Sequence, residues 1–205
     1  MFQRLHHIAY RCRDAQRTVD FYTKVIGLKY VAGLAPPESR SSPSWPLNEP
    51  GQPPRKVVGE PADSIHIFFE LGDGSYLAFF DVAGAPEDEP ERTPWWVKHI
   101  AFETQTMEKL RAAKQRLEAH GVQVLGPKNH DFCQSIYFMD PDGHRLEITV
   151  RTERPDTWQR LEADAGRELE KWNELKRRKY GKKPEALPAA VPALPDDGKS
   201  KIVPA

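Results

Sequence analysis

Apolar and polar side chains alternate in short stretches near the start of the chain, which is the pattern of strands that bury one face. LHHIAYRC at 5–12 alternates in this way, and LKYVAG at 28–33 is a second short strand. Residues 64–82 hold two aromatic strands around the turn GDGS. Two strands joined by a glycine turn predict a hairpin.

A helix is predicted between the first two strands. Val19, Tyr22 and Ile26 recur at three- and four-residue steps, so they share one face of a helix. Asp14 can cap the start of this helix, and Gly27 can end it. The first part of the chain therefore predicts the element order β-α-β-β-β.

The same order begins again at residue 95, after a long loop at 34–61 and a linker at 83–94. The repeated elements are a strand at 95–104, a helix at 107–121, a strand at 122–127 and a strand-turn-strand segment at 135–150. The predicted helix carries one apolar face, formed by Met107, Leu110, Ala113 and Leu117. This internal repeat predicts an α+β domain over residues 1–151, built from βαβββ modules at 4–83 and 95–151.

The pattern changes after Arg151. Residues 155–181 predict a charged helix with one apolar docking face, formed by Trp158, Leu161, Ala165, Leu169 and Trp172. Residues 182–205 are rich in Pro and Ala, so we expect a flexible tail.

Composition excludes several classes of protein. The 205 residues carry 30 basic and 30 acidic side chains, and no block of like charge points to nucleic acid. No apolar run reaches the length of a membrane span, and the first residues lack the apolar core of a signal peptide. The two cysteines, Cys12 and Cys133, show no metal or redox spacing and fit a reducing compartment. We expect a soluble cytoplasmic protein that binds neither nucleic acid nor membrane.

Alternation places two histidines at equivalent positions of the repeat. When HHIAYR is aligned with KHIAFE, the Ile/Tyr and Ile/Phe faces are the ones that a helix can cover, so His7 and His99 lie on the opposite faces. Glu147 joins them, because Leu146, Ile148 and Val150 occupy the helix side of the last strand. If the modules pack side by side, these faces form one concave wall.

Two neutral imidazoles and one carboxylate form a facial triad for a divalent metal. A lone histidine on a strand is more often structural, and a lone glutamate is more often a solvated charge. The pattern alone leaves both readings open. In the first module Ala78 aligns with Glu147, and the acid on that strand, Asp81, faces away from Ala78 unless the strand bulges.

These motifs resemble the vicinal oxygen chelate superfamily, which includes glyoxalase I, extradiol dioxygenases, fosfomycin resistance proteins, methylmalonyl-CoA epimerase and bleomycin-binding proteins. The resemblance lies in HHIAYRCRDAQRTVDFYTKVIGL, KHIAFE and DPDGHRLEIT, and covers roughly residues 4–151. It implies paired βαβββ modules that form a cupped mixed sheet around a metal. It also implies that His7, His99 and Glu147 are the metal ligands.

The resemblance leaves the reaction open. Glyoxalase-like members commonly add a fourth ligand where this chain has Ala78, whereas extradiol dioxygenases use three ligands and carry a tyrosine ten residues before the last one. Tyr137 holds that position, although ordinary strand packing explains it as well. His130 and Asp131 lie shortly upstream, but the proton-shuttling histidine expected near the site of a dioxygenase is not evident.

We therefore predict an extradiol-type dioxygenase that acts on an aromatic or diketone-like small molecule. A glyoxalase-like isomerase, lyase or transferase is the alternative, and a non-catalytic resistance-type binding protein is the third reading. We expect a divalent metal, with Fe(II) favoured over Mn, Ni or Zn, and a homodimer, since two-module members commonly dimerise. The candidate catalytic residues are Tyr137 and His130, and the candidate pocket residues are Phe68, Phe79, Trp95 and Asp131.

Overall fold

A computed structural model describes residues 2–35, 64–83 and 93–185. Most of the predicted loop at 34–61, the linker at 83–94 and the tail at 182–205 lie outside the described residues. Within the described ranges, no helix is long and apolar enough to cross a membrane.

The first module forms a four-stranded sheet in the order β1-β4-β3-β2. Its strands are β1 (His7–Cys12), β2 (Lys29–Leu34), β3 (Ser64–Glu70) and β4 (Tyr76–Val82). β1 pairs with β4 in parallel, and the other neighbours are antiparallel. Between β1 and β2 the chain forms α1 (Ala15–Asp20), which continues as the π-helix η1 (Phe21–Ile26).

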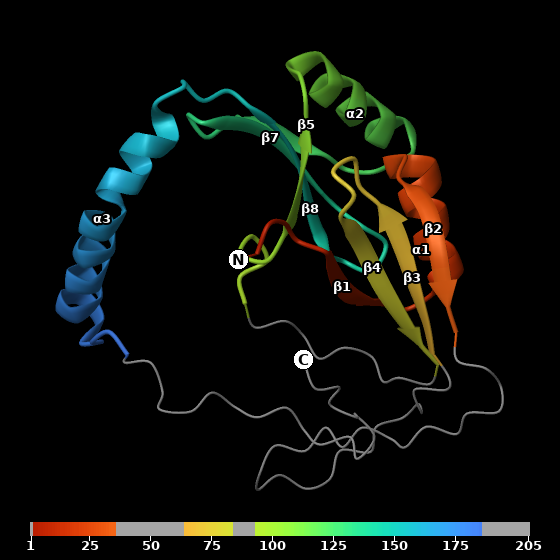
Figure 1. The fold of residues 1–205 in the computed structure, drawn as a ribbon, viewed down its shortest axis with the longest axis horizontal. Helices are drawn as coiled ribbons and strands as arrows, with labels where there is room; N and C mark the ends of the chain where they lie inside the picture. The colour runs from red at the N-terminus through yellow and green to blue at the C-terminus, as the bar shows by residue number, and fades with distance from the viewer. Residues whose placement is uncertain (1, 36–63, 84–92, 186–205) are drawn as a thin grey trace, which may run out of the picture.

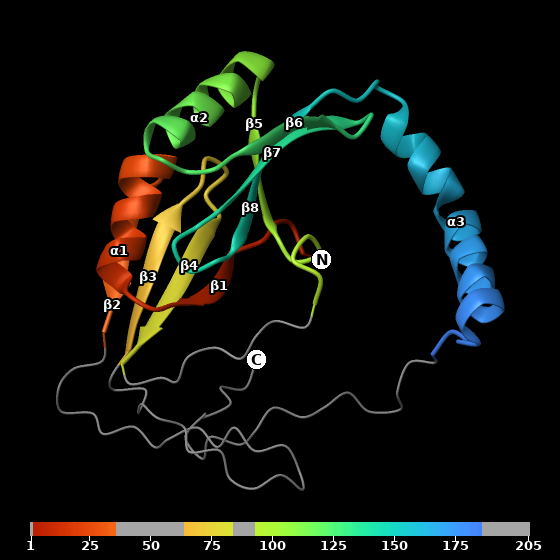
Figure 2. The same ribbon diagram turned by 180° about the vertical axis from the view of Figure 1, so that it is seen from behind.

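The second module repeats this topology in the order β5-β8-β7-β6. Its strands are β5 (Ile100–Thr104), β6 (Leu125–Asn129), β7 (Cys133–Met139) and β8 (Arg145–Arg151), with α2 (Met107–Ala119) after β5. β5 and β8 are again the parallel pair. The predicted α+β fold of two βαβββ modules is confirmed, as two mixed sheets (Figures 1 and 2).

The predicted start and end of the first helix are confirmed. The Asp14 Oδ1 atom accepts a hydrogen bond from the backbone N–H of Arg17 at 2.7 Å. Gly27 ends η1 with a φ of 93°, which is the left-handed region that glycine adopts without strain.

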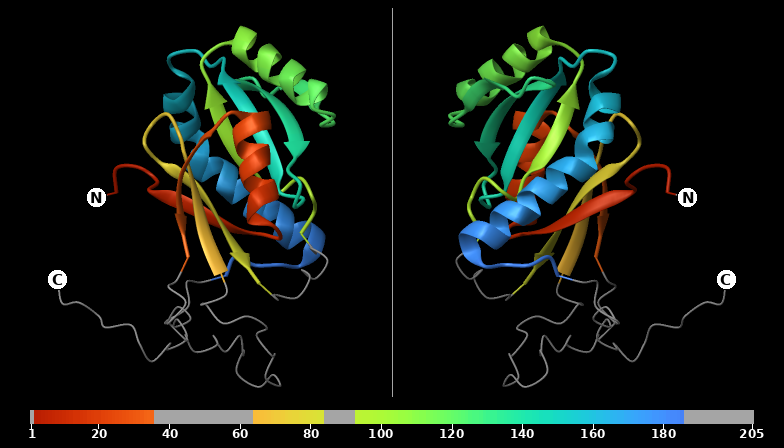
Figure 3. Two further views of the ribbon diagram at one scale, coloured as in Figure 1. Left: turned by 90° about the vertical axis from the view of Figure 1, so that its right-hand side faces the viewer. Right: turned by 90° about the vertical axis from the view of Figure 1, so that its left-hand side faces the viewer.

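The helices of both modules cover one shared hydrophobic core. α1 and α2 lie on the same side of the two sheets, and the remaining helix lies on the opposite side (Figures 1 and 3). The predicted helix-facing residues are in this core, where Tyr22, Leu110 and Leu146 are fully buried. Each sheet therefore keeps its other face open, toward the side away from α1 and α2.

A buried hydrogen bond ties the modules together. The Tyr22 hydroxyl on η1 donates to Asp140 Oδ2 in the β7–β8 turn at 3.0 Å. His144 Nδ1 lies 2.8 Å from the same carboxylate oxygen, and Arg17 forms an ion pair of 2.6 Å with Asp142. The DPDG turn of the second module is thus anchored on the helix of the first.

Two predicted strands begin later than expected. Residues 95–98 form a turn, because the Val97 N–H donates to the Pro94 carbonyl at 2.9 Å, and β5 starts only at Ile100. The predicted strand at 122–127 is β6, shifted to Leu125–Asn129, and its pairing with β7 is irregular between Leu125 and Lys128. At Gly126 an added Cβ would lie 2.6 Å from the Ser135 carbonyl oxygen, so this close approach requires glycine.

The predicted C-terminal helix is present as α3 (Thr157–Tyr180), but its apolar face is exposed. No α3 residue is buried, and Trp158, Leu169 and Trp172 are each more than half exposed. The helix stands apart from both sheets (Figures 1 and 2). Its ring contact with the body joins Trp158 to Phe132.

Candidate metal centre and active site

The open face of the second sheet brings His99 and Glu147 together. Glu147 on β8 is paired with Ala101 on β5 and with Tyr137 on β7, and the residue is only 7% exposed. The His99 Nε2 atom lies 3.1 Å from Glu147 Oε2. Burying a carboxylate costs free energy unless a positive or hydrogen-bonding partner compensates it. The contact with His99 offsets this cost for Glu147.

The tautomer of His99 fits a metal ligand. Its Nδ1–H donates to the Val97 carbonyl at 3.1 Å, so in the neutral imidazole the lone pair is on Nε2. That lone pair faces the Glu147 carboxylate, so a cation or a proton must lie between them. Two ligands about 2.1 Å from one ion at a right angle are separated by about 3 Å, which matches the observed spacing.

His7 lies on the open face of the first sheet, but not with His99 and Glu147. Its ring contacts His66 and Phe68, and its Nδ1 shares a 2.8 Å hydrogen bond with Nδ1 of His6. Among residues 2–35, 64–83 and 93–185, no three His, Cys, Asp or Glu side chains converge closely enough to hold a metal. Among the described residues, the three candidate ligands therefore fall into a close pair, His99 with Glu147, and a separate His7.

The first module lacks an acid at the position of Glu147. Ala9 pairs with Ala78 as Ala101 pairs with Glu147, so the predicted alignment of the repeats is confirmed. Asp81 points to the helix side, where its Oδ2 accepts a 2.8 Å hydrogen bond from the Ala15 N–H. The ladder of β4 with β1 and β3 is continuous, so no bulge turns Asp81 toward the open face.

Tyr137 and His130 lie together beside Glu147. The Tyr137 hydroxyl and His130 Nε2 are 2.6 Å apart. Burial and the neighbouring Glu147 carboxylate raise the pKa of Tyr137, so its phenol stays protonated at neutral pH. This pair can therefore hold a proton at the edge of the site and donate a hydrogen bond to a bound oxygen.

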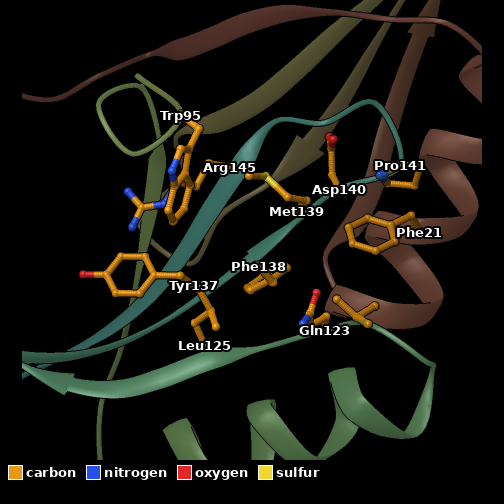
Figure 4. Close-up of a pocket in the computed structure, with 11 residues that line it drawn as sticks. Phe21, Trp95, Gln123, Leu125, Tyr137, Phe138, Met139, Asp140, Pro141 and Arg145 are labelled. Carbon is orange, nitrogen blue, oxygen red and sulfur yellow. The ribbon is translucent and has the colours of Figure 1, made fainter. Parts of the chain in front are cut away.

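Two cavities flank this wall. The aromatic cavity, of about 530 Å³, is lined by rings that include Phe21, Trp95, Tyr137 and Phe138 (Figure 4). The basic cavity, of about 660 Å³, reaches His99 and is lined by Arg11, Arg13, Lys98 and Arg145. Trp95, Met139 and Arg145 line both cavities.

Three predicted pocket residues lie elsewhere. Phe79 is fully buried against Tyr22 on the helix side of β4, so its assignment to the pocket is wrong. Asp131 is exposed in the turn before β7, at a φ of 68°, and lines neither cavity. Phe68 lies on the open face of the first sheet beside His7. Of the predicted pocket residues, Trp95 lines both cavities.

Arg145 was not among the predicted residues, although its position carried a signal. It precedes Glu147 by two residues on β8, so the alternation that places Glu147 on the open face places Arg145 there too. Its guanidinium lies 4.2 Å from the centroid of the Tyr137 ring and 5.3 Å from that of Trp95 (Figure 4).

The chain belongs to the Glyoxalase/Bleomycin resistance protein/Dioxygenase superfamily, whose family model matches residues 4–148. This match covers both modules and ends one residue after Glu147. The resemblance seen in the histidine strands and the closing hairpin is thereby confirmed.

Its curated relatives are enzymes of several kinds. The chain is 26% identical to a lactoylglutathione lyase of Pseudomonas aeruginosa, over 70% of this chain and 80% of that protein. It is 28% identical to the glutathione transferase FosA of Serratia marcescens, over 73% and 82%. It is 25% identical to the putative ring-cleaving dioxygenase MhqA of Bacillus subtilis, over 73% of this chain but only 40% of that protein.

Solved structures share the fold. A glyoxalase/bleomycin resistance protein/dioxygenase domain from Frankia has a TM-score of 0.55 at 16% identity, over 74% of this chain and 99% of that chain. The fosfomycin resistance protein FosX from Listeria monocytogenes, solved with Mn(II) and a dihydroxypropylphosphonic acid, has a TM-score of 0.50 at 22% identity. That likeness covers 78% of this chain and 99% of FosX.

Proposed function

We propose that this protein is a metal-dependent enzyme that chelates a small molecule through vicinal oxygens. The observation that carries the proposal is the 3.1 Å approach of the His99 Nε2 atom to the buried Glu147 carboxylate. Imidazole and carboxylate ligands suit Fe(II), Mn, Ni or Zn, and we favour Fe(II). A bound metal would act as a Lewis acid for the two oxygens of the substrate.

The chain's own residues supply binding and proton handling. The Val97 carbonyl holds the His99 ring in the ligating tautomer, and the aromatic cavity excludes water from an apolar substrate body. Tyr137 donates a hydrogen bond to a substrate oxygen, and His130 exchanges the proton with the phenol across their 2.6 Å contact.

We propose further that a homodimer completes the site, with His7 supplied by the second copy. His7 is separate from His99 and Glu147 within one chain, and its Nε2 has no hydrogen-bond partner in the described part of the molecule. Large apolar side chains are exposed on the open side and on α3, which is typical of a binding surface. These exposed residues are Phe80, Trp95, Trp96, Trp158, Leu161, Leu169 and Trp172.

Mixed dimers test the shared site. His7→Ala and His99→Ala chains are each expected to lose the metal as homodimers. In a mixed dimer one site loses both histidines, but the other keeps a complete set, so half of the wild-type metal content returns. No recovery in mixed dimers that light scattering shows to have formed would contradict a shared site. A mass that stays monomeric at every concentration would do the same.

The reaction we favour is extradiol-type cleavage of an aromatic or diketone-like substrate with uptake of oxygen. Three protein ligands on an octahedral metal leave three positions, enough for a chelated substrate and oxygen. The position of Asp81 under α1 supports a three-ligand set, since it removes the nearest candidate for a fourth ligand. Tyr137, next to Glu147, supports the same reaction.

A redox-neutral isomerase, lyase or transferase is the second candidate, and the relatives support it at least as well as the dioxygenase. The lactoylglutathione lyase and FosA are each covered over about four fifths of their length, whereas the dioxygenase MhqA is covered over 40%. A metal on the same His99–Glu147 pair could polarise a substrate oxygen without any uptake of O2.

Oxygen consumption separates the two candidates. Protein loaded with Fe(II) under anaerobic conditions is mixed with catechols and vicinal diketones, and O2 uptake is followed with an electrode. The dioxygenase proposal expects uptake that is lost in Glu147→Ala. Turnover of a glutathione hemithioacetal without O2 uptake would support the second candidate, and metal binding without turnover of either panel would support a binding protein.

A further inference from the structure

We propose that Arg145 is the anchor for an anionic group of the substrate, so that the ligand is an aromatic or apolar carboxylate or phosphonate. The inference deepens the proposed function, on which it rests for the reacting centre. It adds a charge requirement to a pocket for which the sequence predicted an aromatic or diketone-like ligand.

The guanidinium of Arg145 contacts two aromatic rings and a backbone carbonyl, and its Nε atom makes no hydrogen bond among the described residues. The Tyr137 and Trp95 rings lie 4.2 and 5.3 Å from its central carbon, and Nη1 donates to the Trp96 carbonyl at 2.7 Å. Its Nε atom is buried and has no hydrogen-bond partner among the described residues. Nε and Nη2 form the fork that binds a carboxylate or phosphonate through two parallel hydrogen bonds.

The surroundings of this fork favour an anion. Of the residues that line the basic cavity, four are cationic and one, Asp142, is acidic. Asp142 already forms an ion pair with Arg17 at 2.6 Å. The chain as a whole carries equal numbers of basic and acidic residues, whereas the lining of this cavity has four basic residues and one acidic residue.

The position of Arg145 defines the shape of the ligand. It lines both cavities, so an anionic group bound there can have its apolar body among the rings of the aromatic cavity. Glu147 lies two residues further along the same face of β8. A ligand with an anionic end and vicinal oxygens a short distance away would therefore contact Arg145 and the proposed metal ligands together.

Benzoate and benzyl alcohol test the inference, because they share the ring but differ in charge. Their binding is measured by ligand-detected NMR titration. The wild-type protein is expected to bind benzoate about tenfold or more tightly than benzyl alcohol, as two charge-assisted hydrogen bonds imply. Arg145→Gln should abolish this preference, and Arg145→Lys should retain only part of it. Arg160→Gln, which removes an exposed arginine of α3, is the control and should change nothing.

Two outcomes would overturn the inference: equal binding of both probes to the wild type, or a preference for benzoate that survives in Arg145→Gln. If Arg145 only supports the aromatic rings, Arg145→Gln lowers the melting temperature but leaves the preference intact. Because benzoate could also bind a metal, the titration is repeated in Glu147→Ala. A preference that depends on Arg145 there stands even if the metal proposal fails.

Discussion

The two modules have the same topology and the same strand register, yet their open faces differ in chemistry. At equivalent positions of the closing strands, the first module has Ala78, which is fully buried, and the second has Glu147. The first face carries aromatic rings around His7, whereas the second carries a carboxylate, an arginine and the Tyr137–His130 pair. The two modules thus share one backbone arrangement, and the side chains at a few equivalent positions decide the chemical character of each open face.

Placing an acid on the open face of the first module should have the largest effect on stability among the changes proposed here. Ala78→Glu would force a larger, charged side chain into the fully buried space of a methyl group, so we expect the free energy of unfolding to fall by about 1 to 3 kcal/mol even with His7 nearby as a partner. Ala9→Glu is the control, because Ala9 lies on the same open face but is exposed. It should change stability by about 0.5 kcal/mol or less. Chemical denaturation measures both, and equal stabilities of the two variants would show that the first face tolerates an acid.

The strands and their buried faces could largely be predicted from the alternation of apolar and polar residues in the sequence. Side chains alternate between the two faces of a strand, and a strand in contact with a helix must bury one of them. This rule predicted Ile100 and Phe102 under a helix, and His99 and Glu147 on the opposite face. Phe79 shares the parity of Leu77 and Asp81 on β4, so its burial also followed from that rule. Its assignment to the pocket relied on its aromatic character instead.

Other features depended on contacts between distant segments. Trp95 and Trp96 favour strands by propensity, but the Pro94 carbonyl closes a turn there. The fork of Arg145 becomes visible only when β7 and the 95–98 turn bring two rings onto it. No local pattern could indicate that His7 and His99 would lie apart, because that separation is set by how the modules pack.

The junction between the modules should give the next largest effect. Tyr22→Phe removes the buried hydrogen bond to Asp140, so we expect a loss of about 1 to 2 kcal/mol in unfolding free energy. Tyr10→Phe is the matched control, since Tyr10 also packs on the core side and its hydroxyl has no hydrogen bond to another described residue. A Tyr22→Phe variant as stable as Tyr10→Phe would mean that the bond does not couple the modules.

The smallest effect is expected at Asp81, the acid of the first module that does not face the site. Asp81→Ala removes the bond to the Ala15 N–H at the start of α1 and should cost about 1 kcal/mol of stability. The metal content should stay at the wild-type level, which elemental analysis can check beside the melting curve. Loss of metal in this variant would place Asp81 among the ligands and favour the isomerase-type reaction.

The most direct test of the account is the metal content of protein purified without oxygen. Elemental analysis by mass spectrometry is expected to find one divalent metal per chain in the wild type, most of it iron. It should find much less metal in Glu147→Ala and in His99→Ala, because the loss of a ligand lowers the affinity for metal by at least about tenfold. Arg145→Gln should keep the metal. Stoichiometric metal retained by Glu147→Ala, or a wild-type protein that takes up no metal when supplied with it, would contradict the central claim.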